Sequence, residues 1–159
     1  MSAAGSAIET PDRDRAYREI GRFVFEFSQL EYTLRYHVAE LCRIPDENFE
    51  IATSGLDFAK LCSALLALAD RRAGRKDHAL KEPIARCHEI NTIRLRVVHG
   101  LWVIGVGNNR VIHTSRHSMK SDVFFEKPGV LEGEADRCSQ LRWDVDQAVH
   151  RIFCSLFEG

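Results

Sequence analysis

The sequence predicts a mainly α-helical domain: a four-helix up-down bundle with a small β-hairpin inserted between the third and fourth helices. Apolar residues recur every three or four positions along four segments, and the period changes towards two between about residues 101 and 126. Glycine and proline are few, 10 and 4 of 159 residues. Four amphipathic helices of this kind can bury their apolar stripes against one another, as helices do in a bundle.

The first helix is expected near residues 11 to 43. Thr10-Pro11-Asp12 combines an N-capping residue, a proline at the first helical position and an acid in the first turn. The helix should end before Pro45, because a residue that precedes proline avoids the α-helical conformation. Its apolar stripe consists of Ile20, Phe23, Val24, Phe27, Leu30, Leu34, Val38 and Leu41.

The second and third helices are expected near residues 56 to 73 and 80 to 99. Ser54 and Asp57 have the spacing of a capping box, with Asp in place of Glu, at the start of the second helix. Pro83 lies near the start of the third helix, which can tolerate proline in its first turn. The two stripes consist of Phe58, Leu61, Cys62, Leu65, Leu68 and Ala69, and of Ile84, Cys87, Ile90, Ile93, Val97 and Val98.

Strands are expected only between about residues 101 and 126. Two runs with a period near two flank Gly107-Asn108-Asn109, which is a turn signal for a hairpin. Phe124 and Phe125 can add a third short strand. The fourth helix is expected near residues 134 to 157, with Cys138, Leu141, Val145, Ala148, Val149, Ile152, Phe153 and Leu156 as its stripe.

The composition is that of an ordinary globular protein, with 45% hydrophobic and 28% charged residues. Residues 1 to 9, which are small and polar, are expected to be disordered, and residues 10 to 159 to form one domain. No run approaches the ~20 apolar residues of a membrane span, and the N-terminus lacks the pattern of a signal peptide, so we expect a cytoplasmic protein without membrane contact. The net charge of −1 means that any contact with nucleic acid must be local.

The sequence offers no ligand set for a metal. A di-iron bundle needs Glu-x-x-His pairs on two helices, and no glutamate here is followed by histidine at that spacing. Glu31 and His37 on the first helix, with His88 and Glu89 on the third, make a poor set. Phosphate-binding glycine loops and nucleophile elbows are also missing, so no metal and no cofactor is expected. The cysteines are far apart and are expected to be buried reduced thiols: Cys42, Cys62, Cys87, Cys138 and Cys154.

Three basic residues stand near the end of the third helix, in a segment otherwise suited to a core. Arg94, Arg96 and His99 must each be paired or functional if they lie between helices. At about 100° per residue, Arg96 and His99 share a face, whereas Arg94 lies roughly 140° from His99. Gly100 lets the helix end, which leaves His99 in the last turn, where the helix dipole favours a cation.

This segment resembles the motif of the HEPN superfamily (higher eukaryotes and prokaryotes nucleotide-binding), small all-helical proteins in which four to six residues stand between an arginine and the histidine that follows it. Arg94 and His99 have this spacing, and Gly100-Leu-Trp102 often follows the motif in bacterial members. Phe27-Ser-Gln-Leu30-Glu31 with Leu34 is similar to the family's first helix. The resemblance covers residues 15 to 100 and 134 to 157, and Leu95 stands where the family commonly has asparagine.

The resemblance implies an RNA-binding protein that acts as a homodimer, in a toxin or defence context with a cognate protein partner. In active members, arginine and histidine from two subunits form a metal-independent ribonuclease site. His99 would then act as general acid and base on the 2′-hydroxyl, and Arg94 would stabilise charge on the phosphorane. Asn91 could orient either group, with Arg96 and Glu31 in support.

The residues leave a second interpretation open. Arg94 or Arg96 can pair with Glu31 across the bundle while His99 bonds a carbonyl at the helix end, and the protein is then a non-catalytic module that binds a partner protein or a small ligand. An RNA surface is expected from basic residues if the loop and hairpin share one side: Arg71, Arg72, Arg75 and Lys76, with Arg110, His113, Arg116, His117 and Lys120. Trp102 and the Phe124-Phe125 pair can stack on bases or pack the hairpin on the helices.

Overall fold

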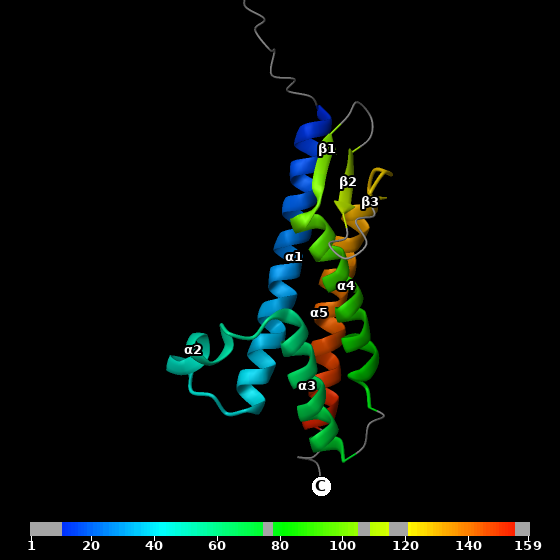
Figure 1. The fold of residues 1–159 in the computed structure, drawn as a ribbon. Coiled ribbons are helices and arrows are strands. Elements are labelled where there is room, and N and C mark those ends of the chain that lie inside the picture. The colour runs from blue at the N-terminus through cyan, green and yellow to red at the C-terminus, as the bar shows by residue number, and fades with distance from the viewer. Residues whose placement is uncertain (1–10, 75–77, 105–108, 115–120, 155–159) are drawn as a thin grey trace, which may run out of the picture.

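The protein is mainly helical, with a small antiparallel sheet at one end of the helices (Figure 1). The structure, a computed structural model, describes residues 11–74, 78–104, 109–114 and 121–154. Its helices are α1 (Pro11–Leu41), a 3-10 helix (Asp46–Asn48), α2 (Phe49–Thr53), α3 (Phe58–Ala73), α4 (Lys81–His99) and α5 (Val130–Cys154), and its strands are β1 (Leu101–Ile104), β2 (Asn109–Thr114) and β3 (Ser121–Phe124).

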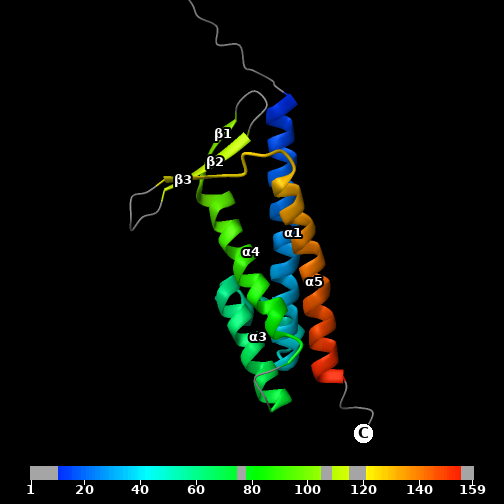
Figure 2. The same ribbon diagram turned by 90° about the vertical axis from the view of Figure 1, so that its right-hand side faces the viewer.

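The four long helices lie close to the expected ranges, but their directions differ from the up-down pattern. Figures 1 and 2 show α1, α3 and α5 running in one direction and α4 running against them. The ring of Phe58, at the start of α3, stacks on Phe27 in the middle of α1, with centroids 4.6 Å apart. Since α3 then runs towards the C-terminal end of α1, the expectation of an up-down bundle is wrong for the first connection.

The physical reason is the segment between α1 and α3. Arg43 has a positive φ of 56° and Pro45 follows, so α1 stops at Leu41. The chain then needs to return about 20 Å, the rise of some 14 helical residues, to reach the level of Phe27. The 3-10 helix and α2 occupy this return, and α2 is a fifth α-helix that apolar periodicity does not predict in so short a piece.

The core lies between α1, α3, α4 and α5. The expected stripe of α1 is buried or partly buried except at Val24, which is 42% exposed, and the expected burial of Val98 in α4 is also wrong, since that side chain is 45% exposed.

Cys62 of α3, Cys87 of α4 and Cys138 of α5 lie fully buried among the aliphatic side chains. These three thiols confirm the expected burial. The expected burial is wrong for Cys42, which is exposed because it lies beyond the end of α1. The side chain of Cys154 is outside the described part of the chain.

Two helix starts differ from the expected residues. The carboxylate of Asp57 accepts a hydrogen bond from the backbone N–H of Lys60 at 2.8 Å, so Asp57 rather than Ser54 is the N-cap, and α3 starts at Phe58. Helix α5 starts at Val130, directly after Gly129, which has a φ of 80°. Glycine adopts this left-handed conformation without steric cost.

The inserted strands form a three-stranded sheet in the order β1-β2-β3. Ile104 pairs with Asn109, so Asn109 belongs to a strand and not to the turn, while the rest of the expected turn lies outside the described residues. The sheet meets α4 where Val111 is fully buried against Gly100. A Cβ atom at Gly100 would lie 2.5 Å from the carbonyl oxygen of Arg96 and 3.1 Å from both methyl groups of Val111, so glycine is required here by close approach.

Within the described residues, no single helix combines the length and the apolar character needed to cross a membrane. In the same part of the chain, no three histidine, cysteine, aspartate or glutamate side chains come close enough together to hold a metal ion.

Candidate functional site

A cleft of about 540 Å³ opens between α1, the turn that precedes α3, and the second half of α4. Arg94 reaches into this cleft, half-buried, and its guanidinium carbon lies 5.9 Å from the centroid of the Phe27 ring. That distance is within the range of a cation–π contact. The walls are formed by Phe27, Glu31, Arg35, residues 54 to 59, Asn91, Arg94 and Leu95.

The carboxylate of Glu31 is bound to Arg35, and this result corrects one expectation. Nη2 and Nε of Arg35 donate to Oε1 of Glu31 at 2.6 and 3.2 Å, and Nη1 donates to the carbonyl of Thr53 at 3.1 Å. The alternative in which Glu31 pairs with Arg94 or Arg96 is therefore wrong, because Arg35, one turn away on the same helix, binds this carboxylate. Across the described residues, no carboxylate lies within 4.0 Å of the Arg94 guanidinium.

Asp57, the other acidic residue of the cleft, also has partners for its carboxylate. Its carboxylate caps α3 and lies 3.3 Å from Nζ of Lys60. The backbone hydrogen bond from Lys60 holds the pKa of Asp57 below its ordinary value, so the carboxylate stays ionised in this role. With both acids engaged, Arg94 is a cation in an open cleft beside the Asn91 amide. Such a group can form charge-assisted hydrogen bonds to phosphate.

The structure separates the members of the Arg-x4-His motif. Arg94 faces the cleft, whereas His99 is exposed in the last turn of α4 and is not part of the cleft. Arg96 turns to the sheet, where its guanidinium carbon lies 4.0 Å from the centroid of the Phe124 ring. One copy of the chain thus brings Arg94, Asn91 and Glu31 together and leaves Arg96 and His99 apart from them.

Trp102 holds the sheet on the helices. Its Nε1 donates to the carbonyl of Val97 at 2.9 Å, and its ring stacks on Phe125 at 6.0 Å with an interplanar angle of 10°. The indole is half-buried in this contact. Trp102 and Phe125 therefore pack the hairpin on α4, which is the second of the two alternatives left open for Trp102, and stacking of Trp102 on bases stays a prediction.

Of the basic residues expected to form an RNA surface, the two whose side chains the structure describes, Arg71 and Arg72, do not line the cleft. Arg71 and Arg72 are exposed in the last turn of α3, about 20 Å along the helix from Phe58 and the cleft. Arg75, Lys76, Arg116, His117 and Lys120 lie outside the described residues, as do the side chains of Arg110 and His113.

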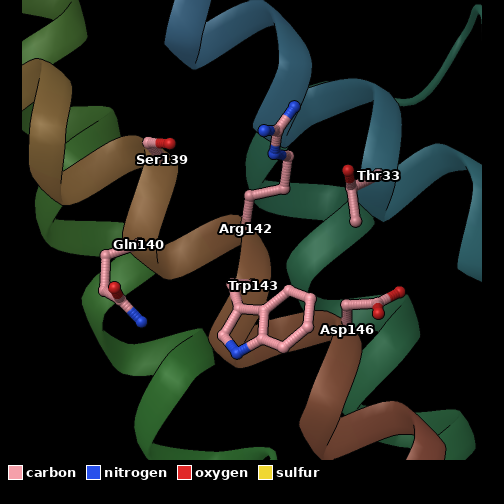
Figure 3. A pocket seen from close by; sticks show the side chains of 6 residues that line it. All are labelled: Thr33, Ser139, Gln140, Arg142, Trp143 and Asp146. Atoms are coloured by element: carbon pink, nitrogen blue, oxygen red, sulfur yellow. The ribbon is translucent and has the colours of Figure 1, made fainter.

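A second groove, of about 510 Å³, lies between α1 and α5 (Figure 3). Trp143 stands in it with 60% of its surface exposed, between Arg142 and Asp146. The groove is lined by Thr33, Ser139, Gln140, Arg142, Trp143 and Asp146. Asp146 is supported from behind by the buried His37, whose Nε2 lies 3.1 Å from Oδ1.

The sequence interpretation missed this groove, although one signal was available. Trp143 lies two residues from Leu141, about 200° round the helix, so it falls on the polar side of an otherwise regular apolar stripe. A large aromatic side chain in that position is a candidate contact residue.

Two of the buried thiols, those of Cys87 and Cys138, have raised pKa values. A hydrogen bond with the thiol of Cys62, together with burial, raises the pKa of Cys87 far above its ordinary value. Burial, reinforced by the charges of Glu134 and Glu26, raises the pKa of Cys138 to about 12. Thiols in this state are protonated at neutral pH and unreactive.

Comparison of the chain with models of protein families, with curated proteins and with solved structures finds no match.

Proposed function

We propose that the protein is a HEPN-like RNA-binding protein that contacts the phosphate backbone through the Arg94 cleft. One observation carries the proposal: the Arg94 guanidinium stands in an open cleft of about 540 Å³, while the carboxylate of Glu31 is taken by Arg35. A cation held in this way, over the face of Phe27, is placed to bind an anion from solution. Asn91 adds an amide that can donate to a phosphate oxygen.

The position of Arg94 in the fold supports the HEPN assignment. Arg94 and His99 lie in the last two turns of α4, the third of the four long helices, and the glycine that follows ends that helix. We interpret α1, α3, α4 and α5 as the four-helix bundle of the family, with the return segment that contains α2 as a variation and the three-stranded sheet as an insertion.

The ribonuclease activity that the resemblance implies requires a second copy of the chain. Arg94 faces the cleft and His99 faces solvent, so one copy does not bring them to a common phosphate. Leu95 and Val98, beside His99, are 42% and 45% exposed, and this apolar surface is suited to a partner's α4. In such a pair, His99 of one copy would act on the 2′-hydroxyl and Arg94 of the other would stabilise the phosphorane.

RNA binding is tested by fluorescence anisotropy with a labelled single-stranded RNA of about 20 nucleotides, long enough to fill a protein groove. Replacing Arg94 by Ala should weaken binding about tenfold or more, because a charge-assisted hydrogen bond is lost, and should reduce the slope of log K against log salt by about one. Arg96→Ala is the matched control, since Arg96 lies on Phe124 outside the cleft. Equal affinities of the wild type and Arg94→Ala would overturn the proposal.

Cleavage is tested with the same RNA in the presence of EDTA. If the composite site operates, His99→Ala abolishes cleavage and leaves binding within about threefold, while EDTA has no effect because the reaction uses no metal. A wild type that binds RNA without cutting it restricts the function to binding and rejects the ribonuclease.

The second candidate, a non-catalytic module for a partner protein or small ligand, is supported by the groove around Trp143. A partner protein or small ligand that binds in this groove without RNA would protect the fluorescence of Trp143 from quenching by acrylamide. If Arg94→Ala leaves RNA binding unchanged and Arg142→Ala, which alters the groove but keeps Trp143, removes that protection, this candidate replaces the first.

A further inference from the structure

The outer face of α1 carries an aromatic stripe, here defined as Phe25, Tyr32 and Tyr36. Their side chains are 59%, 53% and 49% exposed, respectively. Separations of seven and four residues place the three within about 20° of a common line along the helix, opposite the buried face. Three half-exposed aromatic side chains on one line form a contact surface rather than scattered apolar residues.

Charges at the two ends of this stripe are complementary. Arg18 is exposed near its N-terminal end, about 20° round the helix from Phe25, and Glu40 is exposed at its C-terminal end, about 60° from Phe25 on the same side. The midpoint of the pair Phe25 and Tyr32 lies between residues 28 and 29, and the midpoint of the pair Arg18 and Glu40 lies at residue 29. An antiparallel copy of α1 would therefore place Phe25 on Tyr32 and Arg18 beside Glu40, twice, by symmetry.

Gly21 fits the same register. Gly21 is exposed in the interior of α1. Apart from the backbone of its own helix and its two chain neighbours, no described atom lies within 4 Å of the position that its Cβ would occupy. Glycine inside a helix costs about 0.5–1 kcal/mol relative to alanine, and nothing within one copy requires it here. In the antiparallel register, Gly21 faces Tyr36 of the second copy and leaves room for that ring.

Helix α2 also fits this arrangement. Figure 1 shows α2 standing out from the body beside the C-terminal half of α1. The ring of Phe49 lies against that of Tyr32, with centroids 5.7 Å apart, and Ile51 is exposed. The N-terminal half of α1 carries two further exposed apolar residues, Tyr17 and Val24. An antiparallel partner would bring its α2 alongside that half.

We propose that two copies of the protein associate through an antiparallel contact between their α1 helices, centred between Ser28 and Gln29. The stripe alone exposes on the order of 300 Å² of aromatic surface per copy, and a stable interface buries about 800 Å² per partner. The flanking residues and α2 are the source of the rest. This contact goes beyond the proposed function: Arg35 of the Arg94 cleft lies roughly 80° round α1 from the stripe, so the cleft stays open.

The contact is tested first by sedimentation velocity of the full chain. In a Leu95→Glu background, which removes the α4 contact of the ribonuclease site, Phe25→Glu should convert dimers to monomers at concentrations where the Leu95→Glu chain is dimeric. Leu101→Glu, at an exposed apolar residue of the sheet, is the matched control and should leave the dimer intact. Leu95→Glu separates this contact from the α4 contact of the ribonuclease site. Dissociation by Leu95→Glu and not by Phe25→Glu would overturn the α1 contact, and a monomeric wild type would overturn it as well.

A charge swap tests the register. Arg18→Glu and Glu40→Arg should each weaken the dimer about tenfold, because each creates two like-charge contacts, and the double variant should return to within about threefold of the wild type. Additive loss in the double variant would reject the register. Melting curves by circular dichroism confirm that each variant is folded, since Glu40 also lies 3.7 Å from Nδ1 of His37.

Cross-linking tests the direction of the two helices. In a background with Cys42→Ser and Cys154→Ser, a short bis-maleimide should join two copies of Ser28→Cys, at the centre of the contact. It should not join two copies of Arg18→Cys, because the two positions lie about 30 Å apart in an antiparallel pair. Cross-linking of both variants would indicate parallel helices and overturn the proposal.

Discussion

The guanidinium carbon of Arg94 lies 5.9 Å from the centroid of the Phe27 ring, and that ring stacks on Phe58 at 4.6 Å. Three helices meet in this contact, because Phe27 belongs to α1, Phe58 to α3 and Arg94 to α4. The guanidinium of Arg94 thus packs on an aromatic pair that belongs to the core.

The first prediction concerns Phe27. Phe27→Leu should lower the free energy of unfolding by about 1 to 2 kcal/mol and weaken RNA binding severalfold, because the shorter side chain removes the ring that supports Arg94. Urea unfolding and fluorescence anisotropy measure the two effects.

The control is Phe23→Leu, one turn earlier in α1 and fully buried, away from the cleft. It should cost a similar amount of stability and leave RNA affinity unchanged. If both variants reduce RNA affinity equally, the effect of Phe27 is on folding and not on Arg94.

The second prediction concerns Gly100. Gly100→Ala should lower the free energy of unfolding by about 1 to 3 kcal/mol, because its Cβ would meet the carbonyl of Arg96 at 2.5 Å and the methyl groups of Val111. Gly133→Ala is the opposite case, since a Cβ there has nothing within 4 Å, and it should stabilise α5 by about 0.5–1 kcal/mol. Chemical denaturation of the two variants should give changes of opposite sign.

The third prediction concerns Glu19. Burial, reinforced by the charge of Glu132, raises the pKa of Glu19 above 4.5, against the opposing effects of Arg15 and the backbone N–H of Gly129. The folded protein therefore holds this proton at a higher pH than the unfolded chain, so ionisation of Glu19 lowers stability as pH rises through and above 4.5.

Glu19→Gln should accordingly raise Tm at pH 7, and the difference from the wild type should shrink towards zero below about pH 4, where both states of the wild type bind the proton. Glu47→Gln, at an exposed residue, serves as the control and should change Tm little at either pH. A difference for Glu19→Gln that is independent of pH would show that the effect is not electrostatic.

The fourth prediction concerns the thiols of a Cys154→Ser variant. One thiol per native chain, that of Cys42, should react with Ellman's reagent between pH 8 and 10, because Cys42 is exposed. Cys62, Cys87 and Cys138 should react only after unfolding in guanidinium, since they are buried and the pKa values of Cys87 and Cys138 are raised. A second native thiol that becomes reactive as the pH rises would contradict this assignment.

Most of the local structure could be predicted from the amino-acid sequence. The helices lie close to their expected ranges because apolar spacing and proline positions act over a few residues, and the strands lie between residues 101 and 126 for the same reason. The segment with Arg94 and His99 was also marked by the sequence, since basic residues in an apolar stripe stand out without any knowledge of their neighbours.

The contacts that each side chain makes depend on the tertiary structure. In the folded chain, α3 runs parallel to α1, and the carboxylate of Glu31 pairs with Arg35. Arg94 lines the cleft, whereas His99 is exposed to solvent. The tertiary structure also places Trp143 in a groove beside Asp146. Periodicity shows which face of a helix is buried, but not which helix covers it or in which direction that helix runs, because those contacts join residues far apart in the chain and depend on the packing of the whole core.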